Sequence, residues 1–277
     1  MPHHEDRFTA RDGLGLYEQS WLPDRDPVAA VVVVHGINEH GGRYAKLADD
    51  LNRHGYAVYA MDLRGHGRSE GPRALIRTLD EYLDDVELLL KRVAIRQPGK
   101  PVFLFGHSMG GAIVALLGIV RPPPVRGLIL SAPAVLVAGG GVPVLRRLAA
   151  MASMVWPTLR LVRMGCSRIS RDPAVVEAFR NDPLVFHGRF PVRTGAEILR
   201  AAQRIQAGAN RLTLPLLVLH GTGDAVTEPR GSRLLVARAG SANKTLRLYS
   251  GLYHEVLSEP EREQVVADLV AWLDGHR

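Results

Sequence analysis

The sequence predicts an α/β fold with a mostly parallel central sheet, helices on both faces of that sheet, and a helical cap inserted between two of its strands. Short β-branched runs alternate with amphipathic segments along most of the chain, a pattern typical of a parallel sheet covered by helices. The run at residues 30–34 is apolar at every position, as in a strand buried on both faces. The alternation is interrupted once, between residues 134 and 210.

The first half of the chain supplies four predicted strands, at residues 30–34, 56–61, 102–105 and 125–130. Helices are predicted at residues 44–53, at 79–95, and directly after the third strand. In the second of these helices, Leu83, Val86, Leu90 and Val93 recur at spacings of three and four, which places them on one face.

The second half of the chain resumes the pattern with strands at residues 216–219 and 246–249 and a helix at 259–273. Ser258 and Glu261 have the spacing of a capping box at the start of that helix. We therefore expect a core domain formed by residues 1–133 and 211–277, with residues 134–210 as the cap. An insertion near the carboxyl ends of parallel strands is placed to cover the crevice where such sheets bind ligands.

Composition is that of a globular protein, with 46% hydrophobic and 23% charged residues. The net charge of +7 does not come with a basic face interleaved with aromatic residues, so we expect no nucleic-acid partner. The single cysteine excludes an internal disulfide and a cysteine metal cluster, and we expect neither metal nor cofactor.

The N-terminus is polar and lacks the apolar stretch of a signal peptide, and no apolar run is long enough to span a bilayer. A cytoplasmic location is expected, with peripheral contact to membranes as a further expectation. The sequence specifies no oligomeric state.

Ser108 lies between Gly106 and Gly110, at the predicted junction of a strand and a helix. This pattern is typical of a nucleophile elbow, in which a tight turn lifts the serine hydroxyl above the sheet. The chain passes close on both sides of such a turn, and glycine has no Cβ to clash there. Because the five-residue pattern is common by itself, its context, the residues elsewhere in the chain, must decide whether Ser108 is a nucleophile.

That context is a base and an acid in the expected order. Asp224 and His254 each follow a predicted strand, so both lie beyond the carboxyl edge of the sheet, as Ser108 does. The order Ser, Asp, His is that of this class of hydrolase. We therefore predict a catalytic triad of Ser108, Asp224 and His254.

Other residues near the predicted site are interpreted as structural. Asp62 also ends a strand, but it lies upstream of Ser108 and is expected to stabilise its own loop. His35, His107 and His220 flank strand ends and are expected to be hydrogen-bonded packing residues.

An oxyanion hole needs two preorganised N–H donors. One candidate is the backbone N–H of Met109, the residue after the nucleophile, at the start of a helix. The second is the N–H of Ile37, in the loop after an earlier strand. The alternative for that loop is an ordinary glycine turn.

Several motifs together resemble one family. The chain resembles monoacylglycerol lipases and their lysophospholipase-like relatives within the α/β-hydrolase fold. The matching segments are residues 35–40 with Arg43 and Tyr44, residues 62–69, 106–111, 131–133, 220–224 and 251–255. This resemblance implies a small lipid ester as substrate, namely a glycerol carrying one acyl chain. Asn38 departs from the glycine that is usual in the family, which affects the geometry expected for the oxyanion loop.

The resemblance also implies that Glu39 and Arg43 hold the glycerol head group. A pocket with polar side chains at one end can bind the two hydroxyls of a diol, whereas the acyl chain needs only apolar side chains around it. The alternative is an ion pair at the start of a helix, with the two residues at spacing i, i+4. Both interpretations can hold together.

The same triad also serves a lysophospholipase, a general carboxylesterase or an acyltransferase, because the pocket chooses the leaving group and the acceptor. A ligand-sensing protein on a hydrolase scaffold is a further alternative, since fold does not fix function.

The cap suggests contact with lipid. Residues 143–171 contain six arginines and no acid, interleaved with apolar side chains that include Trp156. An apolar helix face rimmed by arginine is typical of an interfacial element. The alternative is a cap packed on the core with solvated arginines.

Overall fold

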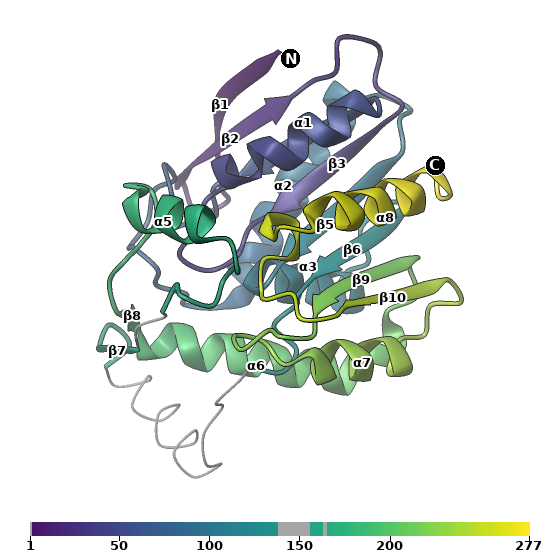
Figure 1. Ribbon diagram of the computed structural model, residues 1–277. Helices are drawn as coiled ribbons and strands as arrows, with labels where there is room; N and C mark the ends of the chain where they lie inside the picture. Colours follow the sequence, from purple (N-terminus) through teal and green to yellow (C-terminus); the bar gives the residue numbers. More distant parts are fainter. Residues whose placement is uncertain (1, 138–155, 163–164) are drawn as a thin grey trace.

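In this computed structural model, which describes residues 2–137, 156–162 and 165–277, one eight-stranded sheet runs through the molecule (Figure 1). Its strands are β1 (His3–Thr9), β2 (Gly15–Trp21), β3 (Ala29–Val34), β4 (Tyr56–Met61), β5 (Val102–His107), β6 (Gly127–Ser131), β9 (Leu216–Gly221) and β10 (Lys244–Tyr249). Their spatial order is β1-β2-β4-β3-β5-β6-β9-β10. From β4 to β10 in this order every neighbouring pair is parallel, and β1 and β2 add antiparallel pairs at one edge. The predicted mostly parallel sheet is confirmed.

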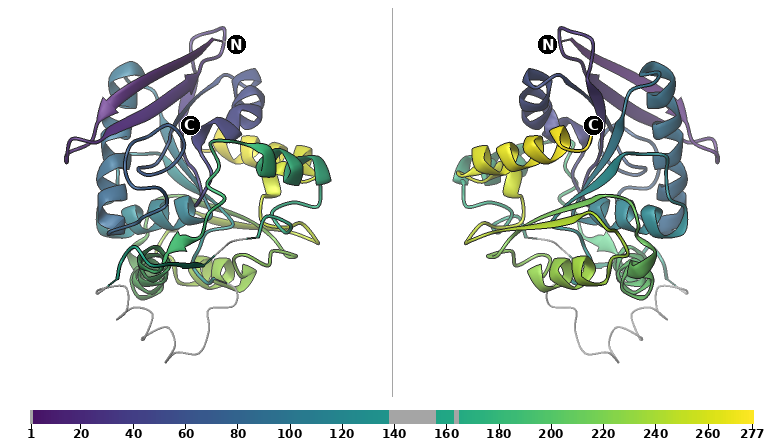
Figure 2. Two further views of the ribbon diagram at one scale, coloured as in Figure 1. Left: turned by 90° about the vertical axis from the view of Figure 1, so that its left-hand side faces the viewer. Right: turned by 90° about the vertical axis from the view of Figure 1, so that its right-hand side faces the viewer.

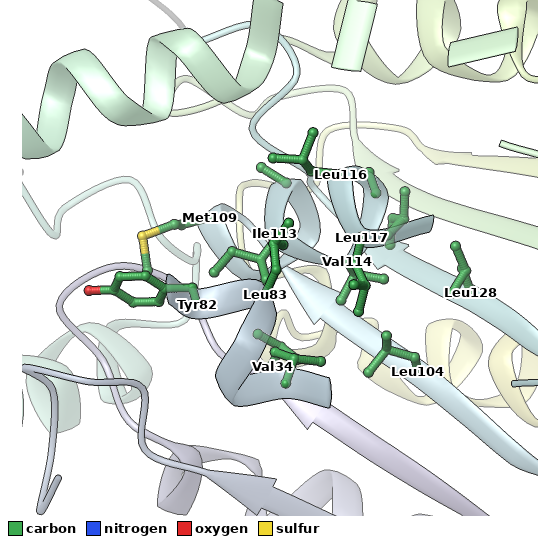
Figure 3. Close-up of a cluster of buried hydrophobic side chains, with 14 of the residues drawn as sticks. Val34, Tyr82, Leu83, Leu104, Met109, Ile113, Val114, Leu116, Leu117 and Leu128 are labelled. Atoms are coloured by element: carbon green, nitrogen blue, oxygen red, sulfur yellow. The ribbon is translucent and has the colours of Figure 1, made fainter. Parts of the chain in front are cut away.

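Helices cover both faces of the sheet (Figure 2). α1 (Ala45–Arg53) and α8 (Arg262–Asp274) pack on one face. α2 (Leu79–Arg96), α3 (Met109–Val120) and α7 (Pro229–Arg238) pack on the other. Successive side chains of β3 alternate between these layers: Val31 and Val33 join the α1/α8 cluster, whereas Val32 and Val34 join the other. Figure 3 shows the second cluster, in which α3 contributes Ile113, Val114 and Leu117.

The two N-terminal strands were not predicted from the sequence. β1 exposes most of its residues and pairs only with β2, so it lacks the alternating apolar pattern of a half-buried strand. A second difference lies in the cap, where no strand was expected. There β7 (Arg160–Val162) pairs with β8 (Phe190–Pro191) in a short antiparallel ribbon.

The last helix begins later than predicted, and its capping box is wrong. α8 starts at Arg262, after a 3₁₀ turn at Val256–Ser258, and its N-cap residue Glu261 makes no side-chain cap. The reason is that Glu259 precedes Pro260, which disfavours a helical backbone at Glu259, and its φ −83° and ψ 162° are extended.

The described part of the cap is attached to the core at several points. Asp172 is the N-cap residue of α5 (Pro173–Asn181), and its side chain accepts from the N–H of Ala174 across 2.9 Å. α6 (Val192–Gly208) is held to the core through Thr194, whose Oγ1 donates to the carbonyl of Ala74 (2.7 Å) and accepts from the N–H of Ile76 (3.0 Å). Among the helices of the described residues, none has the length and apolarity needed to cross a bilayer.

Candidate active site

Ser108 forms a tight turn between β5 and α3. Its backbone has φ 54° and ψ −115°, a region that a non-glycine residue rarely adopts. A Cβ on Gly106 would lie 2.4 Å from the carbonyl oxygen of Gly110, and a Cβ on Gly110 would lie 2.1 Å from that of Val34. Only glycine fits at either position, so the sequence pattern reflects a real steric requirement.

Asp224 and His254 follow the neighbouring strands β9 and β10, at the same end of the sheet as Ser108. The Nδ1–H of His254 donates to Oδ2 of Asp224 across 2.7 Å. An ionised carboxylate only accepts hydrogen bonds, so the proton stays on Nδ1 and Nε2 is left to accept a proton. Burial alone would raise the pKa of Asp224, but hydrogen bonds from His220 and His254 outweigh it and lower that pKa below its usual range.

His220 binds Asp224, a role that the sequence did not predict. Nε2 of His220 lies 3.1 Å from Oδ2 of Asp224, and its Nδ1 lies 2.7 Å from the hydroxyl of Ser232. Thr227 donates its hydroxyl to Oδ2 (2.8 Å) and its N–H to Oδ1 (3.0 Å). His220 is therefore a buried, hydrogen-bonded residue as predicted, and it also holds the acid. The spacing of four between His220, near the end of β9, and Asp224 in the loop that follows was the available signal.

His107 connects the elbow to His254. Its ring centroid lies 4.7 Å from that of His254, and its Nδ1 lies 3.2 Å from the hydroxyl of Ser131. Burial, assisted by the nearby His254, lowers the pKa of His107 to about 3. The imidazole of His107 is therefore neutral near pH 7, so it packs against His254 without repelling a proton held there.

The loop after β3 lies against Ser108. A Cβ on Gly36 would lie 3.2 Å from the Cβ of Ser108. Among hydrogen bonds within the described residues, none occupies the N–H of Ile37 or of Met109. Met109 is the first residue of α3, where the N–H has no acceptor inside the helix. Both candidate donors are thus available, and their role in binding an oxyanion remains a prediction.

Asn38 adopts φ 67°, a left-handed conformation that asparagine tolerates better than most side chains. Its carbonyl accepts from the N–H of Phe186 in the cap across 2.8 Å. The departure from glycine at this position therefore preserves a backbone that glycine would also adopt. His35 and Asp62 have structural roles as predicted: Nε2 of His35 accepts from Leu63 (2.9 Å), and Asp62 accepts from the N–H of Gly41 (2.8 Å).

Glu39 and Arg43 form a buried ion cluster with Glu255. The guanidinium of Arg43 donates to Oε2 of Glu39 (2.9 Å) and to both oxygens of Glu255 (2.8 and 2.9 Å). Oε1 of Glu39 accepts from the N–H of Gly36 (2.5 Å) and from the hydroxyl of Tyr44 (3.0 Å). The ion pair at i, i+4 is confirmed, and Glu255, next to His254, is a partner that the sequence did not reveal.

A cavity of about 310 Å³ lies beside this cluster, between the core and α5. Its lining includes Glu39, Arg43, His107, Ser131 and Glu255. His107 and Glu255 are the chain neighbours of Ser108 and His254. Ser108, Asp224 and His254 do not themselves line the cavity. A Cβ on Gly36 would lie 2.8 Å from Oε1 of Glu39 and 3.2 Å from the Cβ of Ser108, so the polar end of the cavity is close to the serine.

The family model described as serine aminopeptidase, S33, matches residues 25–261. A monoacylglycerol lipase of Mycolicibacterium smegmatis is 39% identical over 98% of this chain and 97% of its own length. The monoglyceride lipase of Rattus norvegicus is 37% identical over 100% of this chain and 91% of its own. The crystal structure of a Paleococcus ferrophilus monoacylglycerol lipase superimposes with a TM-score of 0.83, at 32% identity and with full coverage of both chains.

Proposed function

The chain belongs to the serine aminopeptidase S33 family, in the group of α/β-hydrolases that includes the monoacylglycerol lipases, and we propose that it hydrolyses the ester bond of monoacylglycerols to fatty acid and glycerol. The observation that carries this proposal is the hydrogen bond of 2.7 Å between His254 and Asp224 beside the strained turn of Ser108. The similarity to monoacylglycerol lipases along the whole chain supports the choice of substrate.

In the proposed reaction, Ser108 attacks the ester carbonyl while Nε2 of His254 takes the serine proton. The N–H groups of Ile37 and Met109 hold the negative charge that develops on the carbonyl oxygen. His254 then gives its proton to the leaving glycerol, and the acyl group remains on Ser108. A water molecule, deprotonated by His254, releases the fatty acid. Asp224 orients His254 and stabilises its charged form.

We further propose that the leaving glycerol occupies the cavity beside Ser108, where Glu39 and Arg43 hold its hydroxyl groups. A carboxylate oxygen can accept two hydrogen bonds. Oε2 of Glu39 and both oxygens of Glu255 each accept one from Arg43, which leaves capacity for hydroxyl donors. The ion cluster and a role in substrate binding are therefore compatible.

We expect the enzyme to prefer monoacylglycerols by at least about tenfold in kcat/KM over the di- and triacylglycerols of the same fatty acid. The reason is that only the monoacylglycerol offers two free hydroxyls to a polar cavity, and an acceptor left unpaired costs about 1–3 kcal/mol. The measurement is fatty acid release, with the methyl ester and the lysophospholipid of the same acyl chain as comparisons. Equal rates on all three glycerides would refute the assignment, and faster release from the lysophospholipid would identify a lysophospholipase.

We also propose that the cap contacts lipid surfaces through apolar side chains. Trp156 is 64% exposed and Leu159 is 43% exposed, three residues apart. Two of the described arginines in this region are engaged within the protein, because Arg160 donates to the carbonyl of Arg73 and Arg171 pairs with Glu259. Arg146, Arg147 and Arg163 lie outside the described residues. Arg168 is exposed. The exposed Trp156 and Leu159 are the observation that supports apolar attachment.

The test is co-sedimentation with phosphatidylcholine vesicles. Trp156→Ala combined with Leu159→Ala is expected to lower the vesicle partition coefficient by about tenfold or more, because half-burying each side chain contributes about 0.8–1.5 kcal/mol. The matched control is Ile95→Ala, which removes a more exposed apolar side chain, 79% exposed, from α2. A stronger loss in the control, or binding only to anionic vesicles, would contradict apolar attachment through the cap.

A further inference from the structure

The loop that carries His254 has little support from the sheet. It follows β10, which is the last strand of the sheet and pairs only with β9. Most residues of β10 are exposed or half-buried, whereas β5, which leads to Ser108, is almost entirely buried and has strands on both sides. The general base therefore sits on the less constrained side of the candidate site, and other contacts have to fix it.

Those contacts come from both sides of His254. The N–H of Tyr253, the preceding residue, donates to Oε1 of Glu259 across 2.8 Å. The N–H of Glu255, the following residue, donates to the carbonyl of Ile169 across 2.7 Å. Ile169 belongs to the cap. The backbone N–H groups of the residues before and after His254 are thus bound by one buried carboxylate and by one cap residue.

The same carboxylate is bound by the cap. We call residues 169–172 the cap strap. Within it, Arg171 donates its backbone N–H to Oε1 of Glu259 (3.1 Å) and its Nε to Oε2 (2.8 Å). The hydroxyl of Ser170 donates to the carbonyl of Ser258 across 2.9 Å. Glu259 is 1% exposed and Ser170 is 2% exposed, whereas the side chain of Arg171 is 32% exposed, so the carboxylate is buried and its cationic partner reaches it from the surface.

A buried carboxylate is costly unless charged or polar donors surround it, and here the cap strap supplies most of them. Without the guanidinium of Arg171, the carboxylate of Glu259 would keep only two backbone donors, the N–H of Tyr253 in the loop and the N–H of residue 171 in the strap. The position of the His254 loop is therefore linked energetically to the seating of the cap. The helix that follows the strap, α5, lies next to the start of α8 (Figure 2).

We propose that Glu259 and the cap strap, chiefly Arg171, are positioning residues for His254, so that the cap is part of the catalytic framework and not only a cover for the substrate. This proposal rests on the role of His254 as the general base in the proposed function. Neither Glu259 nor Arg171 touches the reacting atoms. Arg171 holds the carboxylate of Glu259, which holds the N–H of Tyr253. Ile169 of the same strap holds the N–H of Glu255. A misplacement of about 1 Å in a catalytic group can cost about 10²-fold in rate.

The test uses p-nitrophenyl acetate, a short soluble ester that does not need a cap to admit a lipid chain. Glu259→Gln keeps the size of the side chain but turns an amide N–H₂ toward the donors of Arg171 or Tyr253. We expect kcat for p-nitrophenyl acetate to fall about 10–100-fold with KM changed less than about twofold, and kcat for a monoacylglycerol to fall by the same factor. The pH profile of kcat/KM should also shift, since His254 loses its fixed orientation toward Asp224.

The matched control is Glu261→Gln. Glu261 also pairs with Arg171, but its side chain is 50% exposed and it binds no peptide group beside His254. We expect less than about a twofold change in kcat. Arg171→Gln, which leaves the backbone bonds in place, should give an intermediate loss, and it keeps the test decisive if Glu259→Gln does not fold.

The outcomes separate three possibilities. If the variants raise KM for the monoacylglycerol and leave p-nitrophenyl acetate turnover unchanged, the cap acts only on the substrate and the positioning role is wrong. If Glu261→Gln loses as much activity as Glu259→Gln, the effect is a general one of charge, and the proposal also fails. If the wild-type enzyme turns over p-nitrophenyl acetate but no glyceride, while Glu259→Gln shows the expected loss, the positioning role stands and the glyceride assignment fails.

Discussion

Ser108→Ala is expected to lower kcat/KM for monoacylglycerols and for p-nitrophenyl esters by about 10⁴-fold or more while the protein stays folded. Removing the hydroxyl removes the protein atom that bonds to the acyl carbon in the proposed mechanism. The remaining activity would come from the oxyanion donors and from substrate binding alone. Fatty acid release and labelling by a fluorophosphonate probe measure the two consequences. Substantial turnover or continued labelling at the active site would refute the assignment.

A companion variant separates chemistry from stability. Ser108 holds φ 54°, which costs a non-glycine residue about 1 kcal/mol or more. Ser108→Gly should therefore be as inactive as Ser108→Ala but more stable by about 1 kcal/mol, a rise in Tm of roughly 2–4 °C. A glycine variant that melts no higher than the alanine variant would show that the turn stores no strain.

Asp224→Asn is expected to lower kcat by about 10⁴-fold with little change in KM. The N–H groups of Val226 and Thr227 donate to Oδ1 of Asp224, at 2.7 and 3.0 Å. They would hold the amide oxygen of asparagine and turn its N–H₂ toward His254. A donor facing Nδ1 favours the tautomer with its proton on Nε2, and that tautomer cannot accept the proton of Ser108.

Steady-state kinetics on p-nitrophenyl acetate and a monoacylglycerol give this measurement. The control is Asp274→Asn, whose carboxylate accepts from the hydroxyl of Tyr56 across 2.6 Å, at the C-terminal end of α8. It should leave kcat unchanged. A loss of less than tenfold in Asp224→Asn would mean that another group orients His254, and His220 would be the first residue to examine.

The sequence could locate Ser108, Asp224 and His254 because each follows a strand, and strands of a parallel sheet end at one edge. It could not assign Glu259. The sequence predicted Glu259 only as the first residue of the last helix, but its carboxylate binds Tyr253 and Arg171, and Arg171 lies 88 residues away along the chain. Local patterns do not contain such a contact.

The ion cluster illustrates the same limit in part. The spacing of Glu39 and Arg43 indicated a pair at i, i+4, and the pair is present. Both carboxylate oxygens of Glu255 accept from the guanidinium of Arg43. The two residues lie 212 positions apart, so no local sequence pattern indicates this pair. Similarly, His220 was identifiable as a residue near the site, but its hydrogen bond to Asp224 depends on how the loop after β9 folds back.

β1 escaped prediction because its residues are polar, and that polarity has a consequence for the behaviour of the protein in solution. An edge strand offers unpaired N–H and C=O groups to any other chain with a free strand. On β1, the run His3, His4, Glu5, Asp6 and Arg7 places charged or titratable side chains on an exposed edge. Such an edge resists pairing with a second sheet, and so guards against aggregation at high protein concentration.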